Sequence, residues 1–268
     1  MSEQVVKRKR IDKKFDKIRD RVDTGVKKKE FGSRALRKMI NNRLALAGLI
    51  FVTIVILASI MAPLICKYNP LKIDLRSTLQ KPSMEHFLGT DKLGRDIYSR
   101  VIYGGRVSIL VGLGSALGAA LIGVAIGAYT GYKGGWLDNL MLRLSEIVMA
   151  FPQIILVLLF VAIAGQGLMN LIIIFIFTGW GGIYRMTRAQ MLSLREEEYV
   201  QALQAFGLST FKICYKHILP NAIGPIVVNI TLSTAMFILA EAALSFLGLG
   251  VPLNIATWGN IVNVAQDL

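Results

Sequence analysis

The chain has 268 residues, of which 54% are hydrophobic, and a formal net charge of +14 at pH 7. Soluble domains are about 45–50% apolar, so the excess of apolar residues argues against a soluble domain and indicates a membrane protein. Much of the charge lies in residues 1–43, which contain 16 Lys or Arg and 6 Asp or Glu. A basic segment beside a first membrane span fits a membrane surface better than nucleic acid.

Two interpretations of this basic segment stay open. Apolar residues recur at Ile11, Phe15, Ile18 and Val22 among Lys and Asp, and this spacing fits an amphipathic helix on the inner leaflet. A charged tail without regular structure fits the same composition. In both cases the positive-inside rule places residues 1–43 in the cytoplasm.

Long uncharged runs predict five membrane-spanning helices and an all-α polytopic fold. The first run, residues 44–66, would form a helix of roughly 35 Å, enough for a hydrocarbon core of about 30 Å. Residues 107–132 form a second run. Residues 147–184 are too long for one span, and Gly165, Gln166 and Gly167 predict a turn between two. Residues 218–240 form the last run.

Five spans from a cytoplasmic tail place residues 67–106 outside the membrane. This loop carries 8 Lys or Arg, against the positive-inside rule, and we accept the conflict because the tail outweighs the loop. Residues 89–96 resemble a phosphate-binding loop but have Arg95 and Asp96 where Lys and Ser or Thr are required. We therefore expect no ATP hydrolysis by this chain.

Several residues within the spans predict particular roles. Glycines recur about every four residues in the second run and predict close helix packing rather than pore lining; they are Gly114, Gly118, Gly123, Gly127 and Gly131. Pro152 predicts a kink or a first-turn position. Glu241 is the only charge of the last run, and the favoured interpretation places it near the outer end, solvated or paired with an outer-loop Arg.

No catalytic or metal-binding constellation is visible in the sequence. His86 and His217 fall on opposite sides of the predicted membrane, and His217 is interpreted as structural rather than as a ligand. Cys66 is predicted outside and Cys214 inside, so no disulfide is expected.

The longest polar stretch of the second half, residues 193–225, predicts a helix, a glycine turn and a second helix. Ser193 and Glu196 match a capping box at a helix start. An apolar stripe follows at Tyr199, Ala202, Leu203 and Phe206. Gly207 is predicted to end this helix in the left-handed conformation.

The chain beyond this turn completes an apolar corner. Ser209 is predicted to cap a helix that reaches Lys216, and Pro220, Gly224 and Pro225 are predicted to break the chain before the last run. The corner has no partner in the local sequence, so we expect another protein to hold it.

This stretch resembles the cytoplasmic coupling loop of permease subunits of bacterial ABC importers. Ala202, Gly207 and the Leu219–Pro220 pair match the loop pattern, whereas Gln201, Leu203 and His217 depart from it. Residues 217–221, 87–96 and 241–250 resemble the oligopeptide, dipeptide and nickel branch, in its second (C-type) permease subunit. Residues 34–43 resemble the elbow helix that precedes the first span in this family.

The resemblance implies a type I ABC importer transmembrane fold with six spans, of which five are visible. The tail and elbow would cover residues 1–43, the first span 44–66, the outer loop 67–106 and the permease core 107–268, with the coupling loop at 193–222. Residues 251–268 would lead toward a sixth span, with Trp258 at the interface. The coupling residues would be Ala202, Leu203, Phe206, Gly207, Leu208 and Ser209, and the structural residues of the loop Ser193, Glu196, His217 and Pro220.

The implied partners are a second permease subunit in a heterodimer, two cytoplasmic ATPase subunits, an extracytoplasmic substrate-binding protein and the bilayer of a prokaryotic cell membrane. ATP and magnesium would bind to the ATPase subunits, and no cofactor is expected on this chain. Peptides are the expected cargo, and the substrate-contacting residues are not predicted. Three alternatives remain: a nickel or metal-chelate permease, a self-contained channel or secondary carrier, and a membrane-anchored enzyme, which lacks candidate catalytic residues.

Overall fold

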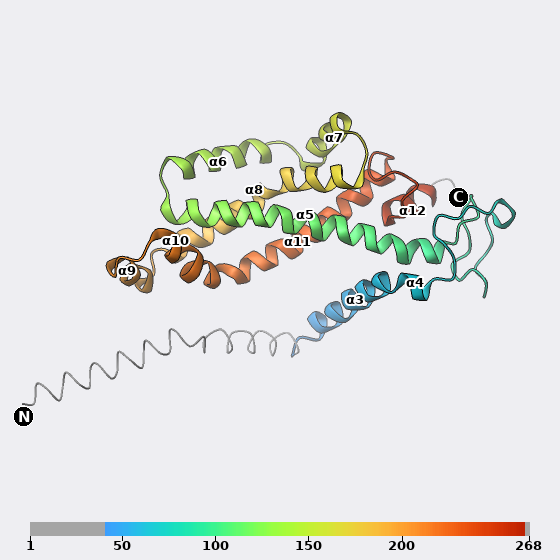
Figure 1. Ribbon diagram of the computed structural model, residues 1–268, viewed down its shortest axis with the longest axis horizontal. Helices are drawn as coiled ribbons and strands as arrows, with labels where there is room; N and C mark the ends of the chain where they lie inside the picture. Colours follow the sequence, from blue (N-terminus) through green and yellow to red (C-terminus); the bar gives the residue numbers. More distant parts are fainter. Residues whose placement is uncertain (1–40, 266–268) are drawn as a thin grey trace, which may run out of the picture. The chain divides into compact units, whose positions relative to one another are not determined.

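The computed structural model describes residues 41–265. Every regular element there is a helix, apart from one isolated bridge between Thr90 and Asp96, so the predicted all-α fold is confirmed (Figure 1). The helices are α3 (Arg43–Ile60), α4 (Ala62–Ile65), η1 (Leu75–Ser77), α5 (Ile97–Lys133), α6 (Trp136–Met149), α7 (Gln153–Ala164), α8 (Leu168–Leu194), α9 (Glu198–Ala205), α10 (Thr210–Lys212), η2 (Ile213–Ile218), α11 (Leu219–Phe246) and α12 (Trp258–Ala265).

The chain divides into two compact units, Met1–Val55 and Ile56–Leu268. The described part of the first unit is residues 41–55, which hold most of α3. The amphipathic pattern at residues 11–22 and residues 34–40 of the elbow lie outside the described residues. The contacts and the sites described below all lie within the second unit.

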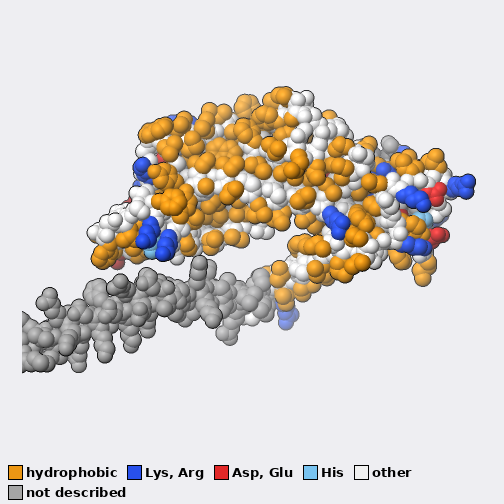
Figure 2. Space-filling view, in the orientation of Figure 1, with side chains coloured by type: hydrophobic (Ala, Val, Ile, Leu, Met, Phe, Trp, Pro, Cys, Tyr) orange, Lys and Arg blue, Asp and Glu red, His pale blue; other side chains and the backbone are white. Residues whose placement is uncertain are grey.

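Within the described residues, four helical segments are long and apolar enough to cross a membrane: α3, α5, α8 and the continuous stretch Thr210–Phe246. A fifth span results if α6 and α7, bent by 85° against each other, count as one. Pro152 stands at this bend as the N-cap of α7, where its missing N–H costs no helical hydrogen bond. Charged side chains gather mostly at the two ends of the helices on the face drawn in Figure 2, with apolar side chains between them.

Glycines bring α5 and α8 into backbone contact. A Cβ atom at Gly123, Gly127 or Gly131 would lie 2.7–2.9 Å from a carbonyl oxygen of α8, closer than atoms can approach. The prediction of close packing is therefore confirmed for these three positions. Gly114 belongs to the same repeat but faces open space, so packing does not require a glycine there.

Several charged side chains of the predicted outer loop, residues 67–106, contact other groups of the chain. Asp91 accepts hydrogen bonds from the backbone N–H and the Nε of Arg95, at 3.0 and 2.7 Å. Arg100 is buried 3.9 Å from the same carboxylate. Arg106 donates to the carbonyl oxygens of Ser59 and Ile60, at 2.6 Å each. Of the cations that conflict with the positive-inside rule, Arg95 and Arg100 are thus buried beside Asp91, and Arg106 is exposed but hydrogen-bonded to two backbone carbonyls.

The preferred interpretation of Glu241 was wrong about the surroundings of its side chain, which is not solvated and is not paired with an arginine among the described residues. Glu241 is fully buried and accepts hydrogen bonds from the hydroxyls of Ser245, at 2.8 Å, and Ser108, at 3.1 Å. Ser108 in turn accepts from the backbone N–H of Trp258, and Ser245 from that of Val251. The carboxylate therefore joins α5, α11 and the start of α12.

Candidate functional site

The coupling corner begins later than the sequence pattern suggests. Ser193 lies inside the last turn of α8, and α9 begins at Glu198 with Glu197 as its N-cap. The predicted capping box is wrong because α8 continues to Leu194, where Met191 and Leu194 pack in the core, and a residue inside a helix cannot cap the next one. Glu196 instead forms an ion pair with Arg195, at 3.0 Å.

Gly207 ends α9 in the predicted conformation. Its φ of +72° is left-handed, and no atom lies within 4 Å of the position that a Cβ would take. The Gly207 N–H donates to the Gln204 carbonyl at 2.9 Å, and the Leu208 N–H to the Leu203 carbonyl at 3.3 Å. This pair of bonds is a Schellman motif, so the backbone angle, not a lack of space, requires glycine.

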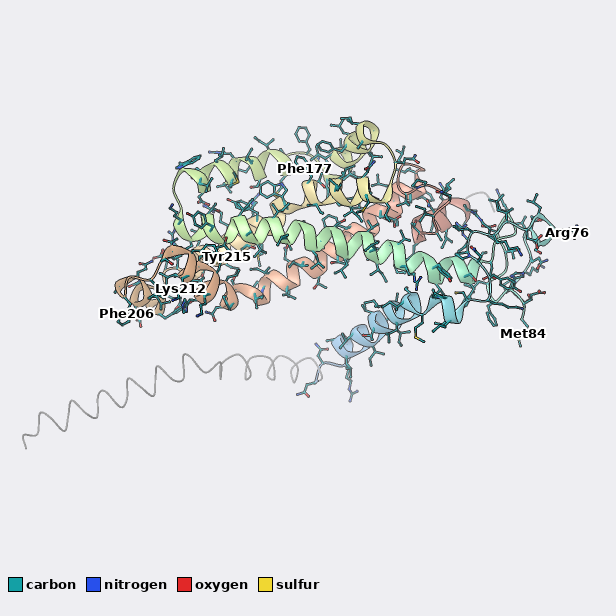
Figure 3. All side chains as sticks on the ribbon, viewed as in Figure 1. Arg76, Met84, Phe177, Phe206, Lys212 and Tyr215 are labelled. Carbon is teal, nitrogen blue, oxygen red and sulfur yellow. The ribbon has the colours of Figure 1, made fainter. Side chains whose placement is uncertain are left out.

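The apolar stripe divides into an inner and an outer part. Leu203 and Leu208 pack against the core cluster that contains Val200 and Ile213, so Leu203, although part of the predicted stripe, is not available to a partner protein in the way that Phe206 is. Phe206 is 76% exposed, and Phe211 is 66% exposed. Phe206 lies at the tip of this end of the unit (Figure 3).

Sequence reasoning missed Phe211, which stands beside Tyr215 with 4.5 Å between ring centroids. Their i, i+4 spacing after the predicted cap at Ser209 was the available signal. Ser209 does stand at the N-cap of α10, but its side chain makes no capping hydrogen bond. Ala202, Gly207 and Ser209 are exposed beside Phe206.

The second helix of the loop does not end at the predicted prolines. α10 passes into the π-helical turn η2 and then directly into α11. Pro220 lies in the first turn of α11, where a proline needs no N–H partner, and Pro225 lies inside the helix. The predicted break was wrong because both prolines lie where the helix accommodates them, and the helix is continuous from Thr210 to Phe246.

The π-helical turn is tied to α5 by side chains. The Cys214 thiol donates to the carbonyl oxygen of Ala128, at 3.1 Å, and the Tyr215 hydroxyl to that of Ala125, at 2.7 Å. A π-helical turn is rare and is frequent at functional sites. We call Cys214 and Tyr215 the α5 clamp.

A third hydrogen bond joins α9 to the same part of α5, from the Gln204 amide to the Tyr132 hydroxyl at 3.0 Å.

His217 was predicted to be structural rather than a ligand. Its backbone carbonyl accepts a hydrogen bond from the Asn221 amide, at 2.8 Å. No group of three His, Cys, Asp or Glu able to hold a metal ion occurs among the described residues.

The segment after α11, which contains Trp258, and the loop at residues 193–222, which contains Gln204, contact opposite ends of α5. The Trp258 indole donates to the Val101 carbonyl, at 3.0 Å, whereas Gln204 bonds to Tyr132. Val101 and Tyr132 are separated by roughly 45 Å along the helix, at 1.5 Å per residue. This separation exceeds a hydrocarbon core of about 30 Å, so the two segments can lie on opposite sides of a membrane.

The comparison with known proteins decides the family. Residues 123–266 match the family described as "Binding-protein-dependent transport system inner membrane component". The chain belongs to this family. Residues 30–82 also match the "N-terminal TM domain of oligopeptide transport permease C". The resemblance to ABC importer permeases is confirmed, and the chain is a multi-pass membrane permease subunit.

Named relatives are similar over most of the chain. The oligopeptide transport system permease protein OppC of Bacillus subtilis is 40% identical over 229 residues, which cover 85% of this chain and 75% of OppC. The dipeptide transport system permease protein DppC of the same species is 39% identical, covering 85% and 72%. DppC of Alkalihalophilus pseudofirmus is 40% identical, covering 87% and 77%.

Proposed function

We propose that this permease subunit imports peptides across a prokaryotic cell membrane and forms half of the translocation pathway with a second permease subunit. The names of its relatives, which are oligopeptide and dipeptide permeases, support this cargo. Two cytoplasmic ATPase subunits bind ATP and magnesium, and an extracytoplasmic binding protein delivers the peptide. The chain itself catalyses no reaction and binds no cofactor.

One observation carries the assignment of the ATPase-docking surface. Phe206 and Phe211 project from a corner that the Schellman motif and the α5 clamp fix in place. Burying a Phe stabilises a complex by about 1.5–3 kcal/mol, which is the size of a binding hot spot. We assign this corner to the cytoplasm and the loop at residues 67–106 to the outside.

The test is purification of the membrane complex through this chain, with the amount of co-purified ATPase measured. Phe206→Asp and Phe211→Asp place a charge in the proposed interface and should remove most of the ATPase. Met84→Asp is the control, because Met84 is 93% exposed in the outer loop and lies at the other end of the unit (Figure 3). Stoichiometric ATPase with Phe206→Asp would overturn the assignment.

A further inference from the structure

A groove of about 350 Å³ opens on the second unit between α6, α7, α8 and α11. Its lining includes Thr178, Gly179 and Gly182 from the middle of α8, and Asn229 and Ser233 from the middle of α11. The centre of each span corresponds to the centre of the bilayer. The volume lies within the range of about 300–1,000 Å³ found for ligand sites.

The lining of the groove is uncharged and mostly apolar, with four polar side chains among the Val, Leu, Met and Phe residues: Gln153, Thr178, Asn229 and Ser233. Gln153 at the start of α7, together with Asn229 and Ser233, contributes side chains that make no hydrogen bond within the described part of the chain. Polar groups in the middle of a membrane span face the interior of a bundle or a cavity, because contact with lipid is costly. These three side chains are therefore available to hydrogen-bond a molecule in the groove.

The shape of the groove depends on two features of its walls. The 85° bend between α6 and α7 opens one side beside α8. Gly182 lines the groove and is exposed, and no atom lies within 4 Å of the position of an added Cβ. A larger side chain at this position would therefore enter the groove without disturbing the packing of α8.

We propose that peptide main chain passes along this groove, and that Gln153, Asn229 and Ser233 hydrogen-bond its amide groups. The inference rests on the proposed function. Amide side chains offer both a donor and an acceptor, which is what each peptide unit presents. Because no lining side chain among the described residues is charged, the groove does not select peptides by the charge of their side chains.

The test introduces a charge of either sign at Asn229 and measures uptake by the complete complex in proteoliposomes. The probes are the tripeptides Ala-Asp-Ala and Ala-Lys-Ala, which have the same termini, delivered by the same binding protein. Asn229→Asp should favour the basic tripeptide over the acidic one, and Asn229→Lys should reverse the preference. At a separation of about 8–10 Å and an effective dielectric constant of 20–40, the introduced charge should change the uptake of each tripeptide roughly four- to thirtyfold. Because the two tripeptides respond in opposite directions, their ratio should change by roughly the square of this factor, at least about fifteenfold.

A second pair of variants tests the space itself. Gly182→Leu should reduce uptake of both tripeptides at least tenfold, while the complex assembles normally. Gly114→Leu is the matched control, because Gly114 also faces open space but lies on α5 and does not line the groove. It should leave uptake unchanged.

The outcomes separate this inference from the proposed function. If the unaltered complex takes up neither tripeptide, the proposed cargo and the inference both fail. If it takes up both and the two Asn229 variants keep its ratio, the inference alone is overturned. Loss of the second permease subunit from the complex with Asn229→Asp and with Asn229→Lys would show that side chains of that subunit occupy the groove, which also overturns it.

Discussion

The α5 clamp allows a test of how the corner at Phe206 and Phe211, the proposed ATPase-docking surface, acts on the spans. Tyr215→Phe removes one hydroxyl, and with it the 2.7 Å bond to the Ala125 carbonyl. Such a bond contributes about 0.5–1.5 kcal/mol net. The lower end applies here, because the bond is exposed and a helical carbonyl keeps its acceptor role toward its own helix. About 0.5–1 kcal/mol corresponds to a factor of roughly 2 to 5 in an equilibrium.

The assay is the number of ATP molecules hydrolysed per peptide transported, measured in proteoliposomes with the complete complex. Tyr215→Phe should raise this number two- to fivefold with an unchanged amount of bound ATPase, because closure of the ATPase moves the corner without moving α5. Tyr129→Phe is the control, since it removes a neighbouring hydroxyl, on α5, whose hydrogen bond, from Lys133, does not involve the clamp. Cys214→Ala should add to the effect and Cys214→Ser should not, because serine keeps a donor. An unchanged ratio in both Tyr215→Phe and Cys214→Ala would refute the reasoning.

Two other predictions follow from packing and orientation. Gly127→Leu forces a side chain against the Tyr184 carbonyl and should lower the free energy of unfolding by at least 1–3 kcal/mol. The measurement is the melting temperature in detergent, which Gly127→Leu should reduce and the control Gly114→Leu should not. Equal melting temperatures for the two variants would contradict backbone contact between α5 and α8. An impermeant thiol reagent applied to intact cells should label a Cys66-only variant and spare a Cys214-only variant, because Cys66 is partly exposed and proposed to lie outside, whereas Cys214 is buried and proposed to lie at the cytoplasmic end. The reverse pattern would invert the proposed topology.

Local rules in the sequence were sufficient for the parts of the fold that depend on one segment. The turn at Gly165 and Gly167 and the left-handed Gly207 are both present, since each depends on the backbone freedom of a single residue. The repeat of Gly123, Gly127 and Gly131 likewise predicted contact, although not with which helix. Pattern rules failed at Ser193 and Pro220, where packing of the flanking helices extends α8 and starts α11 early.

The candidate sites depend on residues far apart in the chain, which no periodicity could bring together. The bonds from Glu241 to Ser108, and from Tyr215 to Ala125, each cross more than 80 residues of sequence. Gln153 and Asn229 share the groove only because the bend at Pro152 turns α7 away from α6. The interpretation of Glu241 failed for the same reason, because the sequence of the last span alone does not indicate that Ser108 of α5 lies beside it.

The contacts also determine which helix receives the movement of the corner. Chain continuity favours transmission of the movement to α11, since η2 continues directly into α11. The side-chain bonds of the corner, however, reach α5, and the glycines of α5 hold the backbone of α8, which carries Thr178 and Gly182 of the groove. A displacement of the corner therefore reaches the groove through α5 and α8 together. Loosening the α5–α8 contact with Gly127→Leu should then raise the ATP consumed per peptide, as Tyr215→Phe does, even though Gly127 contacts neither the groove nor the exposed aromatic corner.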